Sequence, residues 1–354
     1  MMNRQYFIEL TREDVRVPIG VDMILHQYPD VNAILDNGER MGQVLLEAAG
    51  FYKSPIVMPH MDLMLEKDHL LSLIGIPAAD RPAYHFHGCP SDALVAEFRS
   101  RIKGSLSPRM EARNDAIRYV ATHSTLLPMG ISIGPFSLMT KLLADPITPI
   151  FLAGSGVTGD DDPEVKAVEV CLDLALAVVL RAIESQLDAG AKTIIVAEPA
   201  ANTVYLSPKQ MEEGADIYDR FVLAPNAVMR KLVADRGAAL IFHDCGSLTP
   251  EMIRKLNTLR PEVFSFGSPV NLWEAADLVS KDTVLYGNLP SKKFMSDSLI
   301  TVNQLTEMAR DLATRMREKN HPFMLGTECD VLCVHEHKEV IARKVAAFMT
   351  CSVC

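Results

Sequence analysis

The stretch Asp162–Ala197, DPEVKAVEVCLDLALAVVLRAIESQLDAGAKTIIVA, combines the signals of a helix, a turn and a strand, and it sets the expected fold. Asp162 is a suitable N-cap before Pro163, and Gly190 suits the position just after a helix end. Between them, one apolar stripe recurs at helical spacing: Val168, Leu172, Ala175, Leu176, Val179, Ile183 and Leu187. The apolar run Thr193–Ala197 follows at once, as expected of a buried parallel strand.

The same alternation of short apolar runs and longer amphipathic segments continues on both sides of this stretch. The runs are Pro55–Met58, Leu127–Ile133, Thr193–Ala197, Ala239–Phe242, Val263–Phe266, Thr283–Tyr286 and Phe323–Leu325. This order predicts a parallel α/β architecture. An eighth strand has weaker support, around Ala83–Phe86 or Pro149–Leu152, and the pattern alone does not separate a closed barrel from an open sheet. Residues 1–50 are predicted to be a helical lead-in, with one helix over Asn37–Gly50.

Length and charge narrow the class of protein. The 354 residues are 48% hydrophobic, enough for one large barrel domain or two ordinary domains. A formal charge of -10 disfavours nucleic acid and anionic membranes as main partners. The most apolar run, Leu174–Leu180, is far shorter than the roughly 20 residues of a membrane span. The start of the chain shows no secretory signal, and scattered cysteines fit reduced thiols, so we expect a cytoplasmic protein.

A histidine and a cysteine end one of the predicted strands, in the sequence Ala239-Leu-Ile-Phe-His243-Asp-Cys245-Gly246. Residues i and i+2 of a strand point the same way, so the imidazole and the thiol converge at the carboxyl end of the strand. Parallel α/β enzymes place their chemistry at this end. Cys329, just after the last predicted strand, is a candidate third ligand. One imidazole and two thiolates suit Zn²⁺, and three protein ligands leave a coordination position open, as in catalytic sites.

This interpretation has competitors within the sequence. The H-x-C spacing is weak by itself, because His and Cys are also common in protein cores. Two other groups carry ligand-type side chains: His85, His87 and Cys89, and Cys333, His335 and His337. We interpret the first group as part of an ordinary loop, and the second as the solvated start of a final helix over Glu336–Phe348.

Several motifs together resemble the uroporphyrinogen-decarboxylase-like superfamily in their order and spacing. They are Gly130-Ile-Ser-Ile-Gly134-Pro135-Phe136, Gln186-Leu-Asp-Ala-Gly-Ala191, Ala197-Glu198-Pro199, Leu206-Ser-Pro208, His243-Asp-Cys-Gly246, Gly287-Asn288-Leu289 and Gly326-Thr-Glu-Cys329. The resemblance covers residues from about 50 to 350. It implies a (β/α)8 TIM-type barrel over residues 51–354, behind a helical N-terminal extension over residues 1–50.

The superfamily that the chain resembles contains two broad activities. Its decarboxylases act on uroporphyrinogen without a metal and carry an arginine-rich motif near the amino terminus, whereas this chain has only isolated arginines there: Arg12, Arg16 and Arg40. Its zinc-dependent methyltransferases exchange methyl groups with a corrinoid protein and carry H-x-C and a late cysteine. The resemblance therefore implies a zinc site at His243, Cys245 and Cys329. A metal-free decarboxylase remains the alternative.

The implied reaction moves a methyl group between a corrinoid protein and a small acceptor or donor, such as a thiol, tetrahydrofolate or a methoxylated compound. Cobalamin is expected on a separate corrinoid protein, because the chain has no D-x-H-x-x-G motif. A third hypothesis is a non-catalytic binding module with structural zinc, in which Cys333 or Glu328 supplies a fourth ligand.

Three further polar residues follow predicted strands and are candidates for the substrate pocket. Glu198 and Asp62 are the candidate catalytic residues, and Asn288 is a candidate substrate-binding residue. Relatives often have Asp-Pro where this chain has Glu198-Pro199. Each candidate has a plainer interpretation: Glu198 as a cap of nearby backbone, Asp62 as a loop carboxylate, and Asn288 as a strand-end residue outside the pocket.

Overall fold

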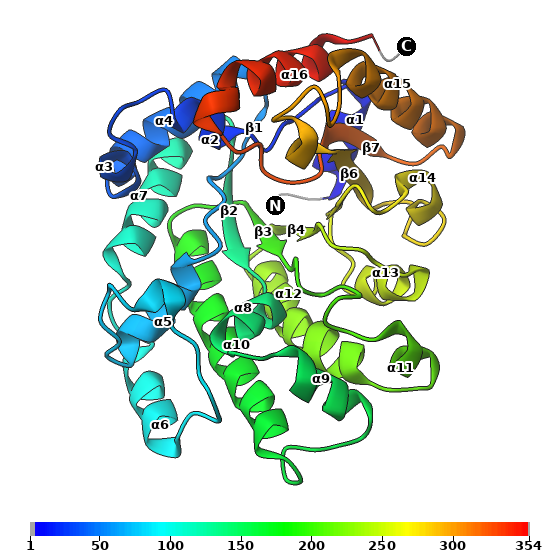
Figure 1. The fold of residues 1–354 in the computed structure, drawn as a ribbon. Helices are drawn as coiled ribbons and strands as arrows, with labels where there is room; N and C mark the ends of the chain where they lie inside the picture. Colours follow the sequence, from blue (N-terminus) through cyan, green and yellow to red (C-terminus); the bar gives the residue numbers. More distant parts are fainter. Residues whose placement is uncertain (1–3, 353–354) are drawn as a thin grey trace.

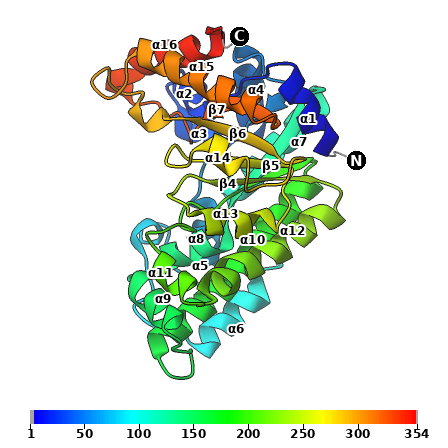
Figure 2. The same ribbon diagram turned by 90° about the vertical axis from the view of Figure 1, so that its right-hand side faces the viewer.

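The computed structural model describes residues 4–352, and its centre is one curled parallel sheet (Figures 1 and 2). The sheet has seven strands in sequence order: β1 (Ile56–Val57), β2 (Leu127–Ile133), β3 (Thr193–Ala197), β4 (Ala239–Asp244), β5 (Val263–Phe266), β6 (Val284–Leu289) and β7 (Phe323–Thr327). Parallel strands in consecutive order, joined by helices, are the arrangement of a TIM-type barrel. The parallel α/β architecture is therefore confirmed.

Helices connect the strands and cover the outer face of the sheet (Figure 1). The α-helices are α1 (Arg4–Arg12), α2 (Val21–Leu25), α3 (Val31–Leu35), α4 (Gly38–Phe51), α5 (Leu65–Leu73), α6 (Asp92–Arg101), α7 (Pro108–His123), α8 (Pro135–Leu142), α9 (Ile147–Gly154), α10 (Pro163–Asp188), α11 (Pro208–Glu212), α12 (Ala224–Asp235), α13 (Pro250–Asn257), α14 (Leu272–Ala275), α15 (Val302–Glu318) and α16 (Lys338–Thr350). Single-turn elements are η1 (Arg81–Ala83), the π-helical η2 (Asp219–Leu223), η3 (Ser291–Lys293) and η4 (His335–His337). No helix within residues 4–352 is long and apolar enough to cross a membrane.

Helix α10 begins and ends where its local signals predict. The Asp162 carboxylate accepts hydrogen bonds from the amides of Glu164 (2.7 Å) and Val165 (3.1 Å), which are otherwise unpaired at a helix start. Gly190 follows the helix with a φ of +108°, a conformation that disfavours side chains with a Cβ. The predicted helix over Asn37–Gly50 is also present, as α4, with the Asn37 side chain as its N-cap.

Both predicted positions for an eighth strand are wrong. Phe86 forms only an isolated parallel bridge with Leu143, outside the sheet. Residues 149–152 lie inside α9, because the Asp145 side chain accepts hydrogen bonds from the amides of Ile147 and Thr148 and starts a helix there. The segment that borders β7 comes from the start of the chain instead. Val17 forms a parallel bridge with Gly326, and its amide donates to the Leu325 carbonyl at 3.2 Å.

Along the strands, successive side chains point alternately into two apolar layers, one inside the barrel and one under the outer helices. Residues of the inner core come from every strand and from the N-terminal segment: Ile56, Leu127, Met129, Ile131, Ile195, Ala239, Ile241, Val263, Val284, Tyr286, Met324, Phe7, Leu10, Val17 and Ile19. The Tyr286 hydroxyl donates to the Val17 carbonyl at 2.6 Å and so ties this segment to β6. Gly326 permits the contact, since a Cβ there would lie 2.3 Å from the Tyr286 ring. Side chains of the segment from Phe7 to Ile19 therefore contribute to the barrel core.

Candidate metal centre

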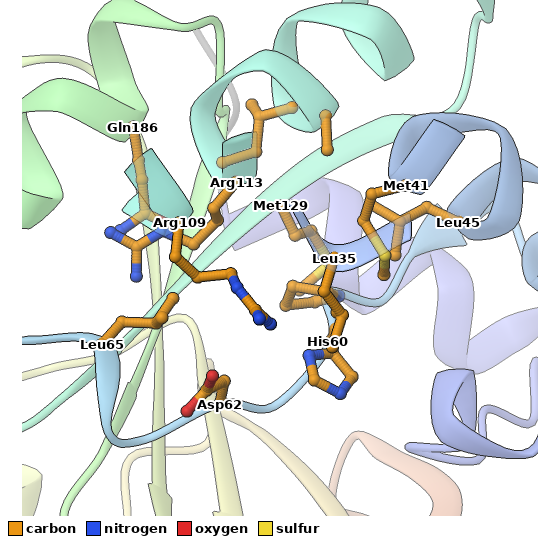
Figure 3. A pocket seen from close by; sticks show the side chains of 13 residues that line it. Leu35, Met41, Leu45, His60, Asp62, Leu65, Arg109, Arg113, Met129 and Gln186 are labelled. Atoms are coloured by element: carbon orange, nitrogen blue, oxygen red, sulfur yellow. The ribbon is translucent and has the colours of Figure 1, made fainter. Parts of the chain in front are cut away.

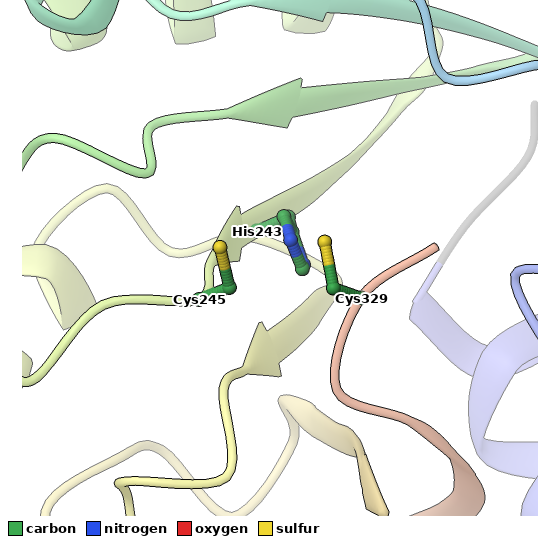
Figure 4. Close-up of side chains that lie close together, drawn as sticks. All are labelled: His243, Cys245 and Cys329. Atoms are coloured by element: carbon green, nitrogen blue, oxygen red, sulfur yellow. The ribbon is translucent and has the colours of Figure 1, made fainter. Parts of the chain in front are cut away.

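His243, Cys245 and Cys329 come together at the carboxyl end of the sheet (Figure 4). His243 is part of β4 and shares the inward direction of Ile241, two residues before it. Cys245 follows the end of β4, and Cys329 lies shortly after β7. One ring nitrogen of His243 and the two sulfur atoms all lie within 4.8 Å of one another. The structure thus brings together the three residues predicted as metal ligands.

Ser265 holds the imidazole in place. His243 and Ser265 are register partners on β4 and β5, and Nδ1 of His243 lies 2.8 Å from Oγ of Ser265. The other ring nitrogen, Nε2, is buried and has no hydrogen-bond partner within residues 4–352. A buried nitrogen without a partner is costly, and metal coordination would satisfy it. With two thiols beside it, this donor set fits Zn²⁺.

The two thiols interact with each other. A hydrogen bond to the Cys329 sulfur and burial together raise the pKa of Cys245 to about 12. The same hydrogen bond lowers the pKa of Cys329, because it stabilises the thiolate. A metal that bound both sulfurs would displace the proton of Cys245.

Glu328, next to Cys329, is engaged in a hydrogen bond outside the group of three candidate ligands. The Glu328 side chain is buried and accepts a hydrogen bond from the Ser268 amide at 2.9 Å. Within residues 4–352, no other group of three or more His, Cys, Asp or Glu side chains has metal-binding spacing, and Cys333 and Glu328 do not join this one. Among the described residues, His85, His87 and Cys89 likewise do not form a group with metal-binding spacing.

Glu198 lies apart from the three candidate ligands. It has the direction of Val196, which faces the outer helices, rather than that of the inward-facing Ile195. Its carboxylate is fully buried and accepts hydrogen bonds from the amides of Phe136 (3.1 Å) and Ser137 (2.8 Å), at the start of α8. The Asn226 side chain donates a further bond at 2.8 Å.

These bonds make Glu198 a cap of α8, which is the plainer interpretation of the residue. Burial raises the pKa of its carboxyl group, while hydrogen bonds from Asn226, Ser137 and Phe136 oppose that rise. Gly134 allows the close approach, because a Cβ there would lie 2.1 Å from the Glu198 carboxyl carbon. The catalytic role of Glu198 stays a prediction.

Asn288 and Asp62 also have defined partners. The Asn288 side-chain amide donates to the carbonyls of Gly267 (2.8 Å) and Val270 (2.7 Å), and so fixes the loop after β5. Asp62 accepts a hydrogen bond from the Met64 amide at 3.0 Å and lines a pocket beside β1 to which none of the three candidate ligands contributes. Their roles in substrate binding and catalysis stay predictions.

Ser265 is the contributor that the sequence interpretation missed. It lies inside the apolar run Val263–Phe266 and shows no spacing motif of its own. The alternating directions of strand side chains could have identified it. Ser265 points the same way as the inward-facing Val263, and a polar residue that faces the barrel interior needs a partner.

The fold and the site define a TIM-type α/β barrel with an imidazole and two thiols at the carboxyl end of its strands. The chain belongs to the uroporphyrinogen decarboxylase (URO-D) family, and the sequence match to this family covers residues 29–347. None of the curated proteins compared with the chain matches it. Among solved structures, a methyltransferase from Methanosarcina mazei is similar, with a TM-score of 0.61 and 17% sequence identity over 95% of this chain and 91% of that one. At this identity the likeness concerns the fold.

Proposed function

We propose that this chain is a zinc-dependent methyltransferase that moves a methyl group between a corrinoid protein and a small acceptor or donor. The observation that carries the proposal is the convergence of His243, Cys245 and Cys329 within 4.8 Å, with Nε2 of His243 buried and unpaired among the described residues. This is the donor set of a catalytic zinc site with a position open to substrate.

The residues of the site have separable roles in this proposal. His243, Cys245 and Cys329 would hold the zinc ion, which when bound supplies a Lewis acid that favours the ionised form of a thiol acceptor or polarises an oxygen-linked methyl donor. Ser265 orients the imidazole so that Nε2 is directed to the two sulfurs. Sγ of Cys245, whose pKa is raised in the absence of a metal, would lose its proton if both thiols became ligands.

Two observations favour this proposal over the alternatives. A structural zinc site needs a fourth protein ligand, and among residues 4–352 no such side chain joins the three. A metal-free decarboxylase, the other activity of the family that the chain resembles, has no use for two thiols beside an unpaired imidazole. The fold shared with the Methanosarcina mazei methyltransferase agrees with the proposal.

The corrinoid protein enters the proposal as a separate partner. The chain lacks a D-x-H-x-x-G motif for holding cobalamin itself. A thiol, tetrahydrofolate and a methoxylated compound are the candidate small substrates. Glu198, Asp62 and Asn288 remain candidates for orienting the substrate, with the structural bonds described above as their present partners.

The direct test of the proposed activity is methyl transfer with free methylcobalamin in place of the corrinoid protein. Zinc-loaded protein is mixed with methylcobalamin and a panel of thiols or tetrahydrofolate, and the loss of methylcobalamin is followed by its absorbance. Exchange that requires zinc and is absent in Cys245→Ala supports the proposal. Decarboxylation of uroporphyrinogen by zinc-free protein, with no methyl exchange in any pairing, would establish the alternative.

A further inference from the structure

An apolar groove lies between the helices α2 and α16 and the end of α4, apart from the three candidate metal ligands. Its volume is about 330 Å³. Pockets for small molecules commonly have volumes of about 300–1,000 Å³ and are lined mainly by apolar side chains with a few polar groups. The groove therefore has the size of a small-molecule site.

Large apolar side chains form much of the groove lining. Met23, Ile24 and Val345 line it and are buried in the protein core. Phe51 also lines it and is 68% exposed, the largest exposed fraction of any large apolar side chain in the described part of the chain. A single exposed apolar residue is ordinary, but one that borders an apolar hollow is typical of a binding surface.

Two alanines keep the groove open along α16. Ala342 and Ala346 lie one helical turn apart, are exposed and line the groove. Their methyl groups leave space that a longer side chain would fill. α16 lines the groove from Lys338 to Thr350, a length of roughly 18 Å along the helix axis. The groove is therefore elongated, as a site for an extended apolar chain would be.

The charged side chains that line the groove are two lysines, Lys53 and Lys338. Neither lysine forms an ion pair with a carboxylate among residues 4–352. Nζ of Lys338 donates to the His26 carbonyl at 3.3 Å, which leaves it further protons to donate. Glu339 follows Lys338 in the sequence but does not line the groove. The lining is thus positively charged in a chain whose formal net charge is -10.

The pocket beside β1 differs in this respect (Figure 3). Its two arginines are already paired with acidic side chains, Arg109 with Asp36 and Arg113 with Glu66, and Asp62 lies on its wall. In the groove along α16, the positive charges remain available to a ligand.

We propose that this groove binds an amphipathic anion with an unbranched apolar tail, such as a fatty acid. The tail lies along α16 against the apolar lining, and the carboxylate pairs with Lys53 or Lys338. A lysine suits this role because its flexible stem lets the ammonium group follow the head group, and the stem itself adds apolar surface. The proposal does not depend on zinc or on methyl transfer.

Calorimetric titration of the purified protein, with ligands below their micelle concentrations, tests the proposal. The probes are decanoate, the uncharged 1-decanol, the cation decyltrimethylammonium, and acetate, which has the head group without the tail. We expect one saturable site for decanoate, about fivefold weaker binding of decanol, still weaker binding of the cation, and no saturable binding of acetate. Equal affinity for decanoate and the cation, or no saturable binding of decanoate, overturns the proposal.

Lysine variants test the recognition of the head group. Lys53→Gln combined with Lys338→Gln should weaken decanoate about fivefold and leave decanol unchanged, so that the two ligands bind equally. Lys103→Gln is the matched control, because Lys103 is exposed, forms no ion pair among the described residues and does not line the groove. The proposal fails if decanoate keeps its advantage over decanol in the double variant.

An alanine variant tests the position of the tail. Ala346→Phe fills the groove and should abolish decanoate binding, whereas Ala96→Phe, at an exposed position on α6, should not. Both sites are exposed, so thermal unfolding should remain cooperative. Full affinity in Ala346→Phe would place the ligand elsewhere and overturn the proposal. If that variant does not fold, the lysine variants still decide.

A second copy of the chain is the competing occupant of the groove. Light scattering after size-exclusion chromatography compares the wild type with Ala346→Phe. An equal molar mass in the two proteins supports a groove that is free to bind a small molecule. A dimer in the wild type that becomes a monomer in Ala346→Phe would make the groove a subunit interface and contradict the proposal.

Discussion

Oγ of Ser265 lies 2.8 Å from Nδ1 of His243, across the ladder between β4 and β5. This bond fixes the ring so that Nε2 is the nitrogen available to a metal. Ser265→Ala should therefore lower zinc affinity by about 10- to 100-fold without removing a ligand. Competition with a chromophoric chelator measures the change. Ser298→Ala, at an exposed site, is the control, and equal affinity in both variants would show that Ser265 does not orient the imidazole.

Glu198 is expected to matter mainly for stability. Glu198→Ala leaves the buried amides of Phe136 and Ser137 without their acceptor, and should cost about 3 kcal/mol of unfolding free energy. Zinc content per folded chain should not change. Denaturant unfolding and metal analysis provide the two readouts, with the exposed Glu213→Ala as the control. Unaltered stability combined with lost methyl transfer would instead support the catalytic role of Glu198.

His69 should make stability depend on pH. Its pKa is about 4 in the folded protein and near 6.5 in the unfolded chain, so the unfolded state takes up the proton first as the pH falls. The stability contributed by the neutral ring is complete above pH 6.5 and is lost as the pH falls towards 4, by about 3 kcal/mol in total. His69→Leu removes this pH-dependent contribution, because leucine does not titrate. No hydrogen bond among the described residues is lost with it, since neither ring nitrogen of His69 has a partner there.

Denaturant unfolding of wild type and His69→Leu at pH 4.5, 5.5 and 7.5 measures this contribution. The variant should gain stability relative to wild type as the pH falls, and other titrating groups cancel in the difference. His123→Leu, at an exposed position near the end of α7, provides the control. A difference between wild type and His69→Leu that is constant over this range would contradict the low pKa.

Local signals in the sequence were sufficient for the elements around α10 and β3. The capping Asp162, the glycine after the helix and the continuous apolar stripe each determine the structure of residues close to them in the sequence. Strand ends were less accurate. β4 extends to Asp244 and β6 to Leu289, beyond the predicted ends at Phe242 and Tyr286, because polar residues at the barrel mouth still pair with the neighbouring strands.

The site could be predicted only in part, for reasons of distance along the chain. His243 and Cys245 share a direction because they are two residues apart in and just after one strand, and this is visible in the sequence. Ser265 reaches His243 only through the register of β4 with β5, which no local pattern specifies. Likewise, Val17 pairs with Gly326 of β7 although the two residues are far apart in the sequence, and no local pattern predicts this pairing.

The zinc content of ligand variants tests the central claim most directly. Wild-type protein, Cys245→Ala, Cys329→Ala and the double variant His87→Ala with Cys89→Ala are purified alike, dialysed and analysed by plasma mass spectrometry. We predict about one zinc per chain in the wild type and in the double variant, and almost none in either single cysteine variant, all four retaining the same circular dichroism. Full zinc content in Cys245→Ala and Cys329→Ala, or its loss in the double variant, would contradict the assignment of the metal centre.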